Sequence, residues 1–161
     1  MSPAPDGGGH HQPGAPAVPF RRVPVGWDGS PDAEAALRMA AAIVGDGPGH
    51  VVAFAVLPSP PHVEDWQDQA GAESVGTHGV KEGFARARAS IATTSRARID
   101  LATVQGTKAA QSVCGYALEN AFDLLVLGRH GDGGMLHPRL GQVAKAAAMT
   151  REIPVLLVSA Q

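Results

Sequence analysis

Two uninterrupted apolar runs constrain this chain more than any other feature of its sequence. One is VVAFAVL at residues 51–57, and the other is DLLVLG at residues 123–128. Neither run alternates apolar with polar residues, and a short continuous apolar run is typical of a strand buried on both faces. Such strands belong to parallel sheets, whose crossover connections are usually helices that cover the sheet. The chain therefore needs helices between its strands.

Segments with helical character do lie between the strand-like ones. Apolar residues recur at helical spacing after the first turn signal, and this periodicity predicts an amphipathic helix. The predicted helices span residues 31–44, 81–97, 107–120 and 140–150. The other predicted strands span residues 21–26, 99–106 and 153–158. This strict alternation of strands and helices predicts an α/β fold, with a parallel sheet covered by helices on both faces.

The first helix has clear boundary signals. Ser30 suits the N-cap, Pro31 suits the first helical position, and Asp32 complements the positive end of the helix dipole. The sequence GDGPG at residues 45–49 ends the helix. These signals indicate a tight turn between the first strand and the first helix.

Three stretches depart from this regular pattern. Pro24 lies inside the first strand, where a proline removes one ladder hydrogen bond, so we expect a bulge or a shortened ladder. Residues 58–79 mix prolines, acids and glycines, and are either a mobile excursion or the loose start of the next helix. Residues 1–20 are rich in glycine and proline without periodicity, which predicts a disordered tail. We expect residues 21–161 to form one domain.

Composition narrows the class of protein. A net charge of −2, without a local cluster of Lys and Arg, argues against a nucleic-acid-binding surface. Cys114 is the one cysteine, which excludes an internal disulfide. The apolar runs are far shorter than the roughly 18 residues of a membrane span, and the N-terminus lacks the apolar stretch of a secretory signal. By elimination we expect a cytoplasmic protein.

A glycine-rich segment follows the second apolar run. Gly128, Gly131 and Gly141 are separated by two and by nine residues, between a predicted strand and a predicted helix. Glycines in this place either make a surface loop or let the backbone approach a ligand. The spacing resembles the nucleotide-binding signature of the universal stress protein family. The opening sequence VGWDGSPDAEAALRMA looks like that family's first strand, aspartate turn and first helix.

The resemblance implies a three-layer fold around a five-stranded parallel sheet with strand order 3-2-1-4-5. That order reverses between the first and fourth strands, and ligands of open α/β sheets bind at the carboxyl ends of strands beside such a point. The resemblance also implies a site for ATP, with or without Mg²⁺, in which Asp28 binds the ribose and Val56 lies against the adenine, with Leu127 nearby. The residues implied to line the phosphates are Gly128, Gly131, Gly141, Gln142 and Val143.

Asp28 and its neighbour Trp27 each have a second interpretation, and Gln142 departs from the pattern of the family. Asp28 lies in Asp-Gly-Ser, which is a good turn before any helix. Trp27 either stacks on adenine or fills space. Gln142 stands where ATP-binding members of the family carry Ser or Thr. Losing that hydroxyl contact costs about 1–3 kcal/mol if the partner stays buried and unsatisfied, which moves a micromolar site toward the millimolar range.

The sequence supports two functions on this fold. The first is a regulatory module of the stress response that binds an adenine nucleotide and hydrolyses it slowly, if at all. The second is a nucleotide-free scaffold that forms a homodimer by pairing its last strand, residues 153–158, as members of the family often do. An enzyme such as an adenylating enzyme is disfavoured, because DGSPD after the first strand has too few glycines and no base or nucleophile pattern.

Overall fold

The computed structural model describes residues 20–57, 66–105, 109–130, 139–150 and 152–160. Side chains are described for these residues except 66–78, 109–110 and 139–142. The predicted tail therefore lies outside the described residues, apart from Phe20, which packs against the core.

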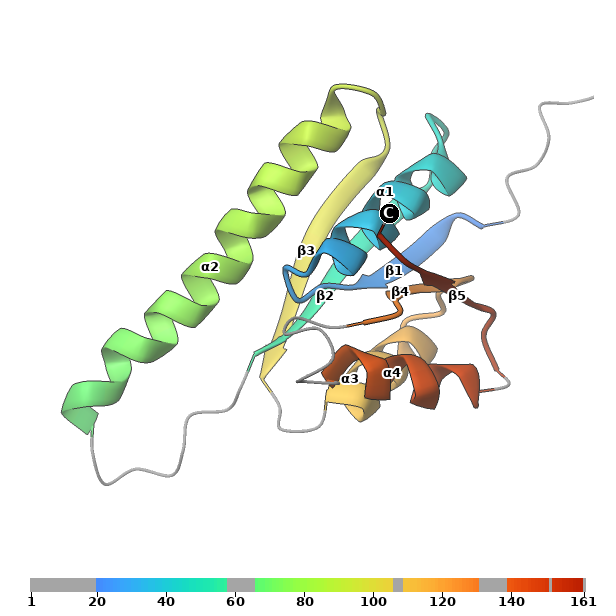
Figure 1. Cartoon of the computed structure of the whole chain (residues 1–161). Helices are drawn as coiled ribbons and strands as arrows, with labels where there is room; N and C mark the ends of the chain where they lie inside the picture. The colour runs from blue at the N-terminus through green and yellow to red at the C-terminus, as the bar shows by residue number, and fades with distance from the viewer. Residues whose placement is uncertain (1–19, 58–65, 106–108, 131–138, 151, 161) are drawn as a thin grey trace, which may run out of the picture.

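Five parallel strands form one sheet in the order β3-β2-β1-β4-β5, as the sequence predicts (Figure 1). The strands are β1 (Arg22–Gly26), β2 (His50–Leu57), β3 (Arg98–Gln105), β4 (Leu125–Gly128) and β5 (Val155–Val158). All the apolar residues of β1, β4 and the first two thirds of β2 are buried, because these strands lie inside the sheet and are covered on both faces.

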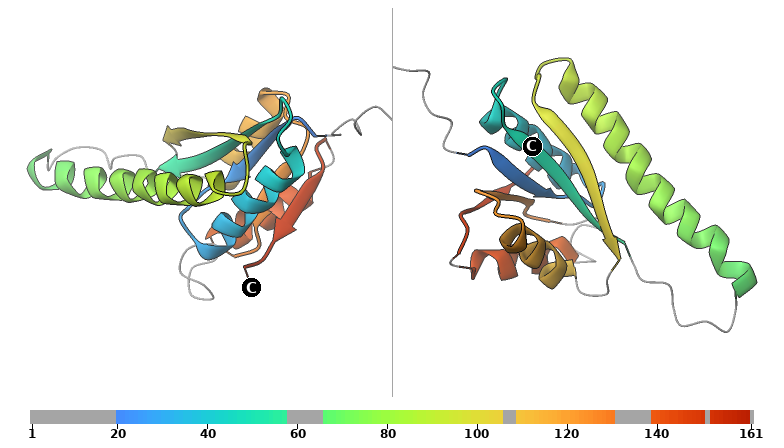
Figure 2. Two further views of the ribbon diagram at one scale, coloured as in Figure 1. Left: turned by 90° about the horizontal axis from the view of Figure 1, so that it is seen from above. Right: turned by 180° about the vertical axis from the view of Figure 1, so that it is seen from behind.

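Two helices cover each face of the sheet, which gives the predicted three layers (Figure 2). The helices are α1 (Pro31–Val44), α2 (Trp66–Ala92), α3 (Ala109–Glu119) and α4 (Arg139–Ala148). One apolar core lies between the sheet and the helices α1 and α2. A second core lies between the opposite face and the helices α3 and α4.

The boundaries of α1 are those that the sequence predicts. The Ser30 hydroxyl accepts a hydrogen bond from the Ala33 N–H at 3.1 Å, as an N-cap does. Gly45 ends the helix with φ of 64°, a left-handed conformation that glycine adopts without a steric penalty. The start of α1 is therefore fixed directly after the end of β1.

Pro24 shortens the ladder on one side of β1 only. All five residues of β1 stand in register with β2, whereas Val25 with Val126 is the single register pair between β1 and β4. The Arg21 carbonyl accepts from the His50 N–H, and the Trp27 N–H donates to the Phe54 carbonyl. The backbone groups of odd-numbered residues therefore point to β2, and those of even-numbered residues, Pro24 among them, point to β4. The missing N–H thus falls on the side where the ladder is short, and the prediction of a shortened ladder is confirmed.

The helix α2 differs from its predicted span at both ends. It begins at Trp66, within the stretch that the sequence left open between an excursion and a helix start, and it ends at Ala92 rather than at residue 97. The hydroxyls of Thr93 and Thr94 donate to the carbonyls of Ser90 and Ile91, at 2.7 and 3.3 Å. Such local bonds compete with continued helix, which explains the earlier end.

Candidate functional site

The carboxyl ends of β1 and β4 lie side by side at the point where the strand order reverses (Figure 1). After β1 the chain turns at Trp27 and Asp28, and β4 ends at Gly128. Two segments that are about a hundred residues apart in the sequence thus flank the end of the sheet at which these strands terminate, which we call its carboxyl edge. This edge is the position at which open α/β sheets bind ligands.

Asp28 takes part in the turn that leads into α1. Its Oδ1 accepts a hydrogen bond from the Ser30 N–H at 2.9 Å, and the residue is half-buried. The turn interpretation of Asp-Gly-Ser is therefore visible in the structure. This bond uses one carboxylate oxygen and leaves the residue at the edge where β1 ends.

Gly128 approaches the start of α1 closely. A Cβ at position 128 would lie 2.8 Å from the Asp32 Cβ, 2.9 Å from the Asp32 carbonyl carbon and 3.0 Å from the Ala33 N. Real side chains do not tolerate such contacts, and here the neighbours are backbone or Cβ atoms that cannot rotate away. The absence of a side chain at this glycine is therefore required by helix packing, whether or not a ligand binds.

The Asp32 carboxylate joins three elements at the same edge. Its Oδ1 accepts from the Ala160 N–H at 2.8 Å, and its Oδ2 accepts from the His130 N–H at 2.9 Å. The His130 Nδ1 lies 3.1 Å from that same Oδ2. Hydrogen bonds from Ala160 and His130, with the adjacent imidazole, hold the pKa of Asp32 below its ordinary value of 3.8 against the opposing effect of burial.

Sequence reasoning missed this Asp32 contact. The sequence predicts for Asp32 only that it complements the helix dipole. Asp32 and His130 are 98 positions apart, and an acidic residue in a first helical turn is too common to signal a tertiary role. No pattern in the sequence could have identified the pair.

Three predicted site residues gather on the face of the sheet that α3 and α4 cover. Leu127 and Val143 are fully buried in that core, and Val56 packs half-buried against it at the end of β2. Leu127 and Val143 therefore have little side-chain surface to offer a ligand. Val56 has more, and it lies at the carboxyl end of its strand.

Trp27 lies on the opposite face, under α2. Its side chain is 4% exposed, and its indole N–H donates to the Val80 carbonyl at 3.2 Å. Its ring meets Phe84 edge to face, with centroids 6.1 Å apart. This geometry supports the interpretation that Trp27 fills space in the core, and not the one in which it stacks on adenine.

The remaining predicted residues belong to the segment between β4 and α4. Gly131 lies outside the described residues. Gly141 and Gln142 fall in the first turn of α4, and the Gln142 side chain lies outside the described set. A helix that follows a parallel strand begins at the strand's carboxyl edge, so this first turn presents backbone N–H groups to the same edge of the sheet.

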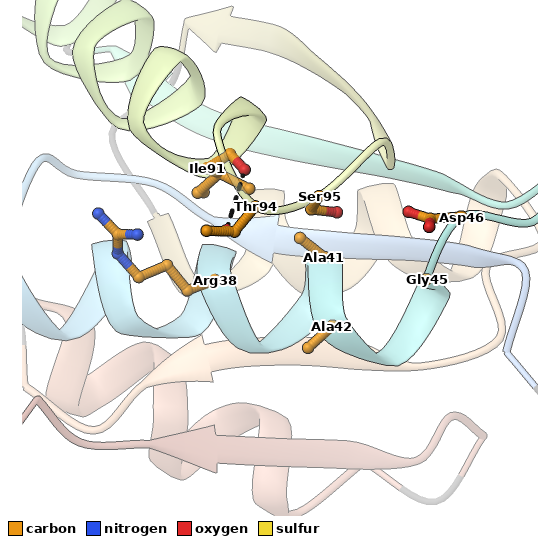
Figure 3. Close-up of a pocket in the computed structure, with 8 residues that line it drawn as sticks. All are labelled: Arg38, Ala41, Ala42, Gly45, Asp46, Ile91, Thr94 and Ser95. Carbon is orange, nitrogen blue, oxygen red and sulfur yellow. Dashed lines mark hydrogen bonds between the residues drawn. The ribbon is translucent and has the colours of Figure 1, made fainter.

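A shallow groove lies at the other end of the molecule (Figure 3). It has a volume of about 440 Å³ between the second half of α1 and the end of α2, and its polar lining includes Arg38, Asp46 and Thr94. The helix α1 runs back across the sheet, so its last turn lies near the start of β2 rather than near Gly128. The groove is therefore separate from the predicted nucleotide site.

Two further observations concern the part of the chain that the structure describes. No group of three or more His, Cys, Asp or Glu side chains there is arranged to hold a metal ion. None of the helices described combines the length and apolar character that a bilayer span needs.

Comparison with solved structures identifies the same fold elsewhere. The universal stress protein UspA from Lactobacillus plantarum has a TM-score of 0.73 and 19% identity, covering 86% of this chain and 97% of its own. A universal stress protein in complex with cAMP has a TM-score of 0.64 and 22% identity, with 89% and 99% covered. A universal stress protein family protein from Arabidopsis thaliana with AMP bound has a TM-score of 0.60 and 16% identity, with 87% and 92% covered.

Comparison of sequences gives the family. No curated protein matches this chain closely enough to be significant. The family model described as the universal stress protein family matches residues 19–159, which is nearly the whole chain. The chain therefore belongs to the universal stress protein family.

Proposed function

We propose that this protein is a regulatory module of the stress response that binds an adenine nucleotide at the carboxyl edge of β1 and β4. The observation that carries the proposal is that β1 and β4 end side by side where the strand order reverses, with the half-buried Asp28 directly after β1 and the glycine motif directly after β4. Solved structures of the same fold are described with cAMP or with AMP bound, which supports an adenine nucleotide as the ligand class.

The residues divide between the parts of the nucleotide. Asp28 binds the ribose, and the half-buried Val56 lies against the adenine. Backbone N–H groups around Gly131, Gly141 and Gln142 receive the phosphates, which suits an anion at a helix N-terminus. Trp27 is assigned to packing, because its ring lies in the core under α2.

ATP, with or without Mg²⁺, is the nucleotide that the glycine motif implies. Gln142 lowers the expected affinity for ATP, because ATP-binding members of the family carry Ser or Thr at this position. We expect hydrolysis to be slow at most, because the sequence contains no Walker-type Gly-Lys-Ser/Thr motif. We expect the protein to act in the cytoplasm.

Isothermal titration tests the proposal directly. ATP with Mg²⁺, and separately AMP, would be titrated into the full chain and into Asp28→Ala. We expect binding in the micromolar to millimolar range, weakened on the order of tenfold or more in Asp28→Ala because a ribose contact is lost. Asp46→Ala is the control, since Asp46 is an exposed carboxylate at the opposite end of α1. Equal affinity in wild type and Asp28→Ala would contradict the assignment of Asp28.

A nucleotide-free dimeric scaffold is the second candidate. The observation that favours it is β5, which lies at one edge of the sheet with Leu157 38% exposed. An apolar edge strand needs cover to avoid uncontrolled pairing. Absence of any heat up to millimolar nucleotide, together with a stable dimer, would select this function over the first.

A further inference from the structure

The ends of β4 and β5 leave two N–H groups without a strand partner. The Arg129 N–H still donates to the Val158 carbonyl at 2.9 Å, so the ladder continues one residue beyond β4. The next N–H, of His130, leaves the sheet. The Ala160 N–H lies two residues beyond the end of β5 and donates to Asp32 of α1 instead of to a strand.

Asp32 supplies the acceptor that both N–H groups lack. One carboxylate oxygen accepts from His130 and the other from Ala160, at 2.9 and 2.8 Å. The side chain is 13% exposed, and the pKa of this carboxyl lies below its ordinary range, so the group is charged at neutral pH. Hydrogen bonds to a charged acceptor are roughly twice as strong as neutral ones.

Packing holds this carboxylate in place. Asp32 belongs to the first turn of α1, and the close approach of Gly128 to its Cβ leaves no room between helix and strand. The backbone from Gly128 to His130 is thus fixed from two sides, by contact at Gly128 and by hydrogen bonds at His130. The segment fixed in this way is the first part of the glycine motif.

We propose that Asp32 is a positioning residue for the nucleotide site, and that it links this site to the end of the edge strand β5. It holds the His130 N–H and so sets the direction in which the chain leaves β4. Because the same carboxylate holds Ala160, a ligand that moves His130 also changes the environment of the Ala160 N–H. This inference rests on the proposed function.

The first experiment compares nucleotide affinity in Asp32→Asn and in Glu34→Gln. Both changes neutralise a carboxylate in the first turn of α1, but Glu34 is half-exposed and pairs with Arg38 within the same helix. We expect Asp32→Asn to bind AMP on the order of tenfold more weakly, since preorganisation of the loop is lost. Glu34→Gln should match wild type. Unchanged affinity in a folded Asp32→Asn would overturn the positioning role.

The second experiment tests whether the nucleotide site and the Ala160 N–H are coupled, by recording amide NMR spectra of the ¹⁵N-labelled chain. We expect AMP to shift the Ala160 resonance in wild type and in Glu34→Gln, and to leave it in place in Asp32→Asn. A merely structural role for Asp32 would not produce this difference.

A variant without nucleotide separates this inference from the proposed function. His130→Ala removes the imidazole beside Asp32 but keeps the backbone N–H. We expect this change alone to shift the Ala160 amide, even if wild type binds no nucleotide and the proposed function fails. An Ala160 resonance that responds neither to His130→Ala nor to bound AMP would overturn the link.

Discussion

Single residues at the carboxyl edge serve folding and the candidate site at the same time. Gly128 must lack a side chain because α1 occupies the space. The Asp32 carboxylate accepts hydrogen bonds from His130 and Ala160, just beyond the ends of β4 and β5. Asp28 closes the turn before α1 with its own side chain. Substitutions here act on stability as well as on binding, so the two effects have to be measured separately.

Gly128→Ala tests the packing requirement. We expect a loss of about 1–3 kcal/mol in the free energy of unfolding, because a methyl group cannot enter a close-packed contact without displacing the helix. The measurement is urea unfolding followed by circular dichroism. Gly115→Ala is the matched control: a methyl group added to Gly115, in α3, would meet nothing within 4 Å, so we expect a gain of about 0.5–1 kcal/mol. An unchanged Gly128→Ala would refute the contact.

The charge of Asp32 predicts a dependence of stability on pH. Its folded pKa lies below 3.8, so the ionised group stabilises the fold above that value, and the contribution disappears as pH falls through the folded pKa. At about pH 5 we expect wild type to exceed Asp32→Asn by about 1–3 kcal/mol in the free energy of unfolding. Below about pH 4 the difference should shrink.

The measurement for this pH prediction is urea unfolding of both proteins between about pH 5 and pH 3. Asp100 also has a lowered pKa: burial raises it, but hydrogen bonds from His50 and Arg98 outweigh that effect. Its contribution is common to both proteins and cancels in the difference. A gap that stays constant down to about pH 3 would mean that Asp32 is not the group responsible.

Local chemistry made part of this edge predictable. The turn at Asp28 and the cap at Ser30 depend on neighbouring residues alone, so the sequence could indicate them. The burial of Trp27 depends on a distant helix, since Val80 and Phe84 of α2 provide its partners. The sequence places Trp27 directly after a strand, but this does not reveal which face of the sheet its ring packs against.

At the scale of elements, apolar patterning predicted every strand, and the family resemblance implied the order in which they pair. Among the helices, the one that departs most from its predicted bounds is α2, whose 27 residues begin well before the predicted start. Its last part carries the apolar residues Phe84, Ala87 and Ile91 that pack on the sheet, and only that part has a readable pattern. The preceding part has little contrast between apolar and polar positions, and several glycines there lower the helical propensity.

Helix α2 also shows why its end was misjudged. Residues 93–97 contain no proline or glycine that would signal a stop. The stop comes from hydroxyl groups that bond to the preceding carbonyls. A threonine pair of this kind is compatible with helix or turn, and the tertiary contacts of the next strand decide between them.

At the scale of the whole molecule, the two edges of the sheet differ. The strand β3 ends in exposed residues, whereas β5 is short and apolar, with Leu157 exposed and its neighbours half-buried. The sequence predicts that this last strand pairs with its copy in a homodimer. In the part of the chain that the structure describes, no strand pairs with the outer side of β5.

Leu157→Lys tests the dimer. We expect wild type to sediment as a dimer at micromolar concentration, and Leu157→Lys to raise the dissociation constant on the order of tenfold or more, because a charge on an edge strand opposes pairing. Leu118→Lys is the control, since Leu118 is 43% exposed on α3 and lies off the sheet edge. A dimer that Leu118→Lys disrupts and Leu157→Lys does not would place the interface elsewhere.

The contact between Gly128 and α1 has a consequence for how this protein could evolve. Helix packing alone forbids a side chain at this position. Selection for a stable fold would therefore retain the glycine in a descendant that had ceased to bind any ligand. A lineage can lose its nucleotide while this part of the motif survives, so the glycine records the ancestry of the fold and says little about what a present-day member binds.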